Sequence, residues 1–225
     1  MMSEDREFSL APSDWLGPVA SNLPWINTLV DLWKIARKAV QRLAEEGLYE
    51  VLEYESTLEL KDTRGINATF HKRERVRYLQ NSIIAHQDQA WADGEFLLDY
   101  RCTPGVPVDH YRLGRKTYIL ISLREVKNRG DINEFNIQWG LRRSFVCTTG
   151  FWETEISHRT RHVKIQVIFP RNRPPLRLSV VEGTRQKAYP LGADAQVQLP
   201  DGRWLVSWES SRPRLYERYL LKWDW

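Results

Sequence analysis

The stretch EYESTLELKDTRGINATFHKRER, residues 53–75, decides the fold. In its first half, Leu58 and Leu60 alternate with acidic residues, which is the period-two pattern of a half-buried strand. Asp62-Thr63-Arg64-Gly65 follows as a turn, with Gly65 suited to the left-handed position of a three-residue hairpin loop. The alternation resumes after the turn, and a return strand is predicted from Ile66 to about Leu79.

A hairpin closed with Asp62 opposite Ile66 has a defined register. Leu58 then faces Phe70 and Leu60 faces Ala68 on the apolar side. On the other side Glu55 faces Arg73, and Glu53 faces Arg75. One register satisfies both faces, and cross-strand pairs of this kind are what stabilises a sheet.

Short strands continue to the last residue of the sequence. About ten strands at 8–15-residue spacing, without intervening helical patterns, predict an antiparallel β-sandwich over 48–225. Within it, Thr148–Ile156 and His162–Phe169 are expected to form a hairpin. The further strands are expected at Ser82–His86, Glu95–Arg101, Thr117–Arg124, Glu134–Leu141, Leu176–Glu182, Arg203–Glu209 and Tyr219–Trp225.

One amphipathic helix is predicted ahead of the strands, over 23–47, after an irregular arm, 1–22. Pro24 suits its first turn and Gly47 its end. Apolar residues recur along it at three- and four-residue steps, and further apolar residues widen the stripe in its first half. Such a helix needs burial on two sides. The chain is therefore expected to be mainly β, with one long helix in front.

Composition excludes several classes of protein. The chain has 225 residues, of which 42% are hydrophobic and 28% charged, so it is globular rather than disordered or collagen-like. Two cysteines exclude a disulfide-rich scaffold. No apolar run reaches the roughly 18 residues of a membrane span, and no signal-peptide pattern opens the sequence. These features predict a cytoplasmic protein without a transmembrane segment.

Enzyme signatures are absent from the sequence. It contains no P-loop, no G-x-G-x-x-G, no G-x-S-x-G and no H-E-x-x-H motif. We therefore expect neither a cofactor nor catalysis. The leading hypothesis is a protein-interaction, sensor or adaptor module that docks through its helix on a partner protein or on a second copy of itself. The expected contact residues are Trp25, Ile26, Leu29, Leu32 and Trp33.

Two surfaces other than a protein partner are alternatives. The first is a membrane surface, which the basic polar face of the helix could contact. Acidic residues in and beside the helix oppose its attraction to anionic lipids, so this alternative is less favoured. An anion or nucleic-acid surface fits the charge distribution, since residues 1–60 carry 5 Lys and Arg against 11 Asp and Glu while the rest of the chain is basic. The candidate anion-binding residues are His71, Arg73, Arg75, Arg77, Arg115, Arg159, Arg161, Arg171 and Arg173.

Two further groups of residues are candidates for chemistry. The segment 88–114 is rich in Gly, Pro and aromatic residues and is expected to be a special loop region, with Trp91, Asp93, Asp109 and Tyr111 as its binding residues. A metal-dependent hydrolase is a third hypothesis. Its ligands would come from His158, His162, Glu153 and Glu155, although two arginines between the histidines oppose a cation.

Overall fold

The computed structural model describes residues 47–225, and there the chain consists of strands joined by turns. The prediction of a mainly β protein is confirmed for this part. The arm and the helix, which were predicted over 1–47, lie outside the described residues apart from Gly47. No helix within the described residues is long and apolar enough to cross a membrane.

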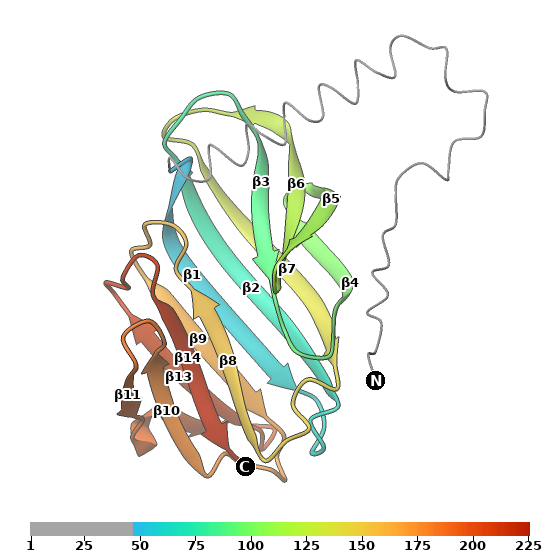
Figure 1. Cartoon of the computed structure of the whole chain (residues 1–225), viewed down its shortest axis with the longest axis vertical. Coiled ribbons are helices and arrows are strands. Elements are labelled where there is room, and N and C mark those ends of the chain that lie inside the picture. The colour runs from blue at the N-terminus through green and yellow to red at the C-terminus, as the bar shows by residue number, and fades with distance from the viewer. Residues whose placement is uncertain (1–46) are drawn as a thin grey trace, which may run out of the picture. The chain divides into compact units, whose positions relative to one another are not determined.

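Fourteen strands form three sheets, more than the ten or so expected (Figure 1). The strands are β1 (Tyr49–Leu60), β2 (Asn67–Tyr78), β3 (Ile83–Ala90), β4 (Glu95–Thr103), β5 (Val106–Leu113), β6 (Lys116–Lys127), β7 (Ile132–Arg142), β8 (Thr149–Glu155), β9 (Val163–Phe169), β10 (Arg177–Glu182), β11 (Lys187–Pro190), β12 (Gln196–Gln198), β13 (Trp204–Ser210) and β14 (Arg218–Asp224). A short 3-10 turn, Ala193–Ala195, precedes β12.

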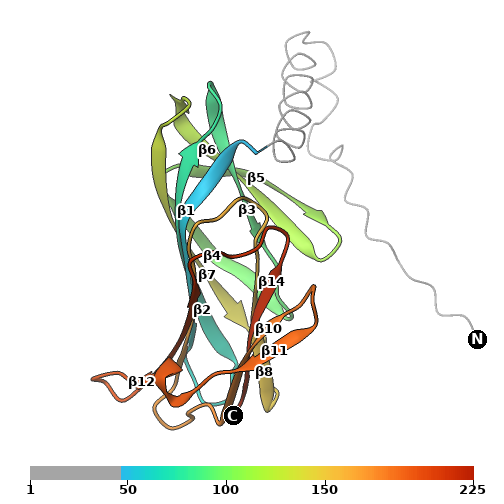
Figure 2. The same cartoon turned by 90° about the vertical axis from the view of Figure 1, so that its left-hand side faces the viewer.

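The largest sheet is the central element of the described residues. It has seven strands in the order β12-β13-β9-β1-β2-β7-β4. A four-stranded sheet, β11-β10-β14-β8, and a three-stranded sheet, β3-β6-β5, complete the fold. In profile, the two smaller sheets lie on the same side of the large one, the four-stranded sheet below the three-stranded sheet (Figure 2). Each therefore covers a different part of one face.

The β1–β2 hairpin has the predicted register. Leu58 pairs with Phe70, and Leu60 pairs with Ala68. Glu55 pairs with Arg73, with 3.3 Å between the charged groups. The apolar side faces the core and the charged side faces outward, as the alternation requires.

The hairpin turn is held by one carboxylate. Asp62 accepts hydrogen bonds from the backbone N–H groups of Arg64, Ile66 and Asn67, at 2.9, 3.1 and 2.8 Å. Gly65 has a φ of +68°, and a Cβ there would lie 1.9 Å from the Phe145 carbonyl oxygen. Only glycine fits this position, because a side chain would be strained in conformation and would collide with backbone.

Two details of the predicted topology are wrong. Thr148–Ile156 and His162–Phe169 do not form a hairpin, because β8 pairs with β14 while β9 lies between β1 and β13. The β1–β9 pair is also parallel, so the fold is not purely antiparallel. Period-two alternation identifies the buried face of a strand but carries no information about the strand beside it.

Aromatic rings fill the space between the large sheet and the four-stranded sheet. The Phe70 ring of β2 lies 4.8 Å from the Trp152 ring of β8, and the Phe169 ring of β9 lies 5.4 Å from the Trp223 ring of β14. Trp223 is only 2% exposed. Rings of this size supply much of the apolar area that a core of this kind buries.

We predict that Trp223→Ala lowers the free energy of unfolding by about 3–5 kcal/mol, because it leaves a large cavity in the core. Urea denaturation followed by circular dichroism measures this change. Leu176→Ala is the control, since Leu176 is 76% exposed and its truncation is expected to cost less than about 0.5 kcal/mol. Equal stabilities of the two variants would contradict the packing described here.

Candidate functional site

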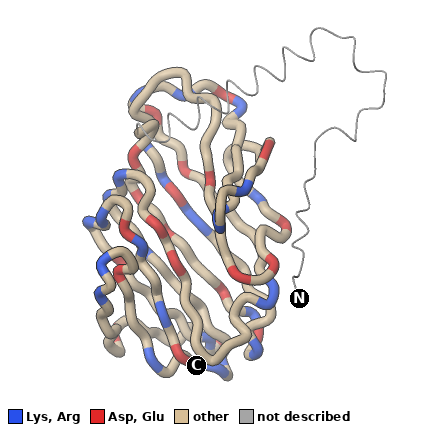
Figure 3. The backbone as a smooth tube through the Cα atoms, viewed as in Figure 1, with Lys and Arg blue, Asp and Glu red and all other residues tan. Residues whose placement is uncertain are grey.

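The outward-facing arginines of β2 are neutralised by glutamates. Arg73 donates to Glu53 at 2.8 Å, and Arg75 lies 3.3 Å from the same carboxylate. Arg77 pairs with Glu50. Elsewhere too, Lys and Arg are intermixed with Asp and Glu over the strands (Figure 3). This row of arginines is therefore a set of paired charges rather than a stripe open to a polyanion.

The other arginines proposed for anion binding lie on three connections, the β5–β6 turn, the β8–β9 loop and the β9–β10 loop. Arg161 is 3.4 Å from Glu50, and the guanidinium carbon of Arg173 lies 3.5 Å from the centre of the Trp225 ring. Arg115, in the β5–β6 turn, is 3.4 Å from Asp93. Arg161 therefore shares the Glu50 carboxylate with Arg77, while Arg115 and Arg173 have other partners. Arg159 lies on the same loop as Arg161, and Arg171 lies on the same loop as Arg173.

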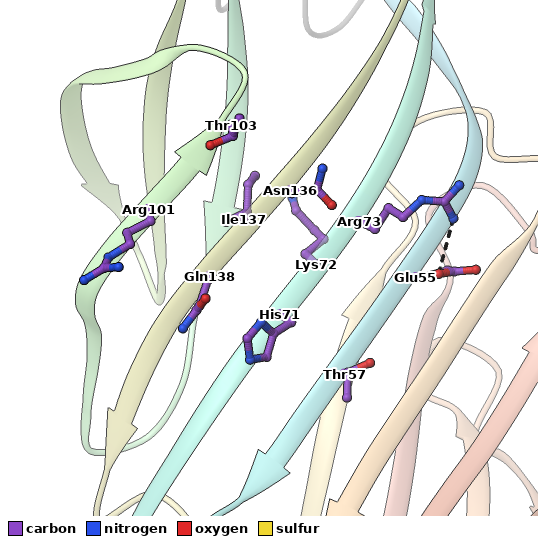
Figure 4. A pocket seen from close by; sticks show the side chains of 10 residues that line it. All are labelled: Glu55, Thr57, His71, Lys72, Arg73, Arg101, Thr103, Asn136, Ile137 and Gln138. Atoms are coloured by element: carbon purple, nitrogen blue, oxygen red, sulfur yellow. Dashed lines mark ion pairs between the residues drawn. The ribbon is translucent and has the colours of Figure 1, made fainter.

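A polar hollow of about 340 Å³ opens on the outer side of the large sheet (Figure 4). It lies across β1, β2, β7 and β4, and it includes His71 and Arg73 from the predicted anion-binding set. Its lining residues are Glu55, Thr57, His71, Lys72, Arg73, Arg101, Thr103, Asn136, Ile137 and Gln138.

A second depression, the aromatic groove, brings together four residues singled out from the sequence, Trp91, Asp93, Arg115 and Glu153. Trp91 and Asp93 in the β3–β4 loop and Arg115 in the β5–β6 turn line it together with residues of β8 and β14. Its volume is about 470 Å³, within the range of about 300–1,000 Å³ typical of ligand pockets. Apolar walls come from the rings of Phe145, Phe151, Trp152 and Trp223, and the β3–β4 loop lies opposite the start of β8 (Figure 1).

The groove lies along the unpaired edge of strand β8. β8 is the last strand of the four-stranded sheet and pairs only with β14 among the described strands. Trp225 N–H donates to the Thr148 carbonyl, and Ile156 N–H donates to the Glu217 carbonyl. Because the bonded residues of an antiparallel ladder alternate, the backbone groups of Phe151 and Glu153 point to the open side.

Two indole N–H groups at the groove have no hydrogen-bond partner within the described residues. They belong to Trp152 and Trp223, which are 7% and 2% exposed. Gly150 packs directly on Trp223, since a Cβ there would be 2.6 Å from the Trp223 ring. Both donors lie in the core among the rings of Phe70, Phe145 and Phe169.

The acidic side chains around the groove are paired with arginines, and Lys222 is a cation without such a partner among the described residues. The carboxylates of Asp93, Glu153 and Asp224 each lie 3.4–3.9 Å from an arginine. Lys222 has no ion pair within the described residues and pairs across the sheet with Phe151, whose side chain is 41% exposed. The groove therefore presents an exposed ring beside an unpaired ammonium group.

The segment 88–114 is not the single loop region that its composition suggested. β4 and β5 occupy most of it, and Gly94, Gly105 and Gly114 lie in the turns that begin or end these strands. Asp109 and Tyr111 lie on β5, where the Tyr111 ring stacks on Tyr118 at 5.1 Å. Neither lines the groove that contains Trp91 and Asp93.

The proposed metal ligands are engaged elsewhere. His158 stacks on the Tyr49 ring at 4.3 Å, and His162 lies 3.6 Å from Glu209. Glu155 pairs with Lys116 at 2.7 Å. Within residues 47–225, no three His, Cys, Asp or Glu side chains come close enough to hold a metal ion. The helix residues from Trp25 to Trp33 lie outside the described residues.

A buried ionic cluster joins the large sheet to the three-stranded sheet, and the sequence analysis missed it. Lys72 of β2 forms an ion pair with Asp88 of β3 and lies 3.1 Å from Glu74. Tyr100 of β4 donates to the other oxygen of Asp88 at 2.8 Å, and His86 is 3.7 Å from Glu74. Both β2 residues alternate inward with Phe70, so the hairpin register already placed them on the core side.

The charges of this cluster stabilise one another. Burial alone would lower the pKa of Lys72, but Asp88 and Glu74 hold it well above the ordinary value of 10.5. Burial alone would raise the pKa of Glu74, but Lys72 and His86 hold it far below 4.5. The lysine thus stays protonated and the glutamate ionised at neutral pH, an arrangement that suits a structural link rather than a proton donor or a nucleophile.

We predict that the cluster makes the fold sensitive to acid. The pKa of Glu74 is depressed in the folded chain, so its contribution is present above the unfolded value of about 4.5 and is lost as the pH falls below it. Glu74→Gln is expected to be less stable at pH 7 by about 3–5 kcal/mol, and its stability should fall less steeply between pH 5 and pH 2. Urea denaturation across this pH range is the measurement. Parallel curves for the two proteins would show that Glu74 is not ionised in the core.

Comparison with models of known protein families gives no match to this chain, and comparison with curated protein sequences gives none either.

Proposed function

We propose that this chain is a non-catalytic protein-interaction module that binds an extended segment of a partner protein in the aromatic groove beside β8. The free edge of β8 carries the proposal. An added strand there would find backbone groups to pair with, the mode known as β-augmentation. A protein-interaction module is also what the sequence predicts, but the site proposed here lies among the strands rather than on the predicted helix. Docking through Trp25 and its neighbours stays a prediction, as does a cytoplasmic location.

The side chains around the edge support a specific kind of segment. Phe151 and Trp91 offer ring surface for apolar side chains, and aromatic residues are the usual anchors of protein interfaces. Lys222 supplies the cation without a partner, so an acidic residue in the bound segment complements it. We infer a segment in which apolar residues flank an acidic one.

The test uses a displayed library of short random peptides, selected on the full chain. Selected peptides are expected to carry an acidic residue next to apolar ones. Phe151→Asp and Lys222→Glu should each weaken binding at least about tenfold, as loss of an interface anchor does. The control is Val126→Asp, at the far end of β6, where Val126 is also exposed, at 57%. Isothermal titration calorimetry gives the affinities.

Amide hydrogen exchange distinguishes strand addition from contact through side chains alone. The N–H groups of Phe151 and Glu153 should exchange fast in the free chain and slowly in the complex, because a bound strand accepts hydrogen bonds from them. Peptides that bind Phe151→Asp as well as the parent chain would overturn the proposal. Dimerisation of the chain that Phe151→Asp abolishes would also overturn it, and would assign the groove to a second copy.

A further inference from the structure

We propose that the polar hollow on the outer side of the large sheet binds one phosphate or sulfate group of a small molecule. This site is separate from the groove, since the hollow lies across β1, β2, β7 and β4 and the groove lies at β8 and the β3–β4 loop. It does not depend on the function proposed above.

Cross-strand pairing builds the hollow from two adjacent rows of side chains. In one row Thr57 pairs with His71, His71 with Gln138, and Gln138 with Arg101. In the other, Glu55 pairs with Arg73, and Asn136 pairs with both Arg73 and Thr103. The rows put side chains from four neighbouring strands side by side across the sheet, with Arg101 at one end (Figure 4). Rigid strands rather than loops therefore position the polar groups.

Most of these polar side chains have no hydrogen-bond partner within the described residues. The side chains of His71, Gln138, Asn136 and Thr103 make no hydrogen bond there, whereas the Thr57 hydroxyl donates to Gln166 at 3.3 Å. Amide, imidazole and hydroxyl groups are all able to donate to an oxyanion. The hollow thus collects several free donors at one place.

Arg101 supplies the charge. It is exposed and has no ion pair within the described residues. Arg73, in the neighbouring row, is instead surrounded by the carboxylates of Glu53, Glu55 and Glu134 at 2.8–3.3 Å. A guanidinium group flanked by neutral donors suits an oxyanion, because charge-assisted hydrogen bonds are the strong ones.

The glutamates around the hollow limit the ligand to a small one. Glu53, Glu55 and Glu134 border the side of Arg73, and Glu59 lies on β1 beyond Thr57. An extended polyanion would pass over these carboxylates, whereas its binding requires a continuous row of cations. A single oxyanion placed at Arg101 avoids them. The favoured ligand therefore carries one such group, and a nucleic-acid strand is disfavoured.

The experiment titrates the full chain with sodium sulfate and with inorganic phosphate at constant ionic strength, followed by NMR. The side-chain signals of Arg101, Gln138 and Asn136 are expected to shift together. Arg101→Gln should weaken both anions at least about tenfold, since it removes a charged donor. Arg129→Gln is the matched control, because Arg129 is an exposed arginine on the β6–β7 connection. Phe151→Asp should also leave anion binding unchanged, which separates this site from the groove.

Two results would overturn the proposal. One is anion binding that Arg101→Gln and Arg129→Gln weaken equally, which would indicate nonspecific attraction to a basic chain. The other is a single-stranded oligonucleotide that binds far more tightly than inorganic phosphate, with steep salt dependence, and loses its affinity in Arg101→Gln. That second result would assign the hollow to a nucleic-acid backbone.

Discussion

The ion pair between Lys72 and Asp88 holds the three-stranded sheet against the large one. Its atoms are buried, and Glu74, Tyr100 and the backbone N–H of Gln89 are further partners around it. Asp88 is near the end of β3, and the chain continues from there into Trp91. The ion pair therefore fixes where the β3–β4 loop lies, and with it the wall of the groove that faces β8. A buried ionic link of this kind gives specificity of arrangement more than stability.

A single strand, β2, contributes to both sides of the large sheet. Lys72 and Glu74 point into the ionic cluster, while His71 and Arg73 line the hollow on the opposite side. The period of two makes this division strict, since a slip of one residue would exchange the two sets. The core and the proposed anion site thus depend on the same register, which the Asp62 turn sets.

Local pairing was predictable from the sequence, and long-range pairing was not. The β1–β2 register follows from adjacent residues with complementary faces, and Trp91, Asp93 and Arg115 were each singled out before they met in one groove. The pairing of β8 with β14 joins residues about 70 positions apart, and alternation alone does not choose between distant neighbours. The β1–β2 register already places Lys72 and Glu74 on the core side. It does not predict which residues of β3 and β4 they contact.

A double-mutant cycle between Lys72 and Asp88 tests most directly whether this ion pair joins the two sheets. The cycle compares Lys72→Met, Asp88→Asn and the double variant by urea denaturation. We expect the double variant to be more stable than the sum of the single losses implies, by at least about 1 kcal/mol, because each single variant leaves a charge in the core without its main partner. Losses that simply add would show that the two residues act independently, and would contradict the account.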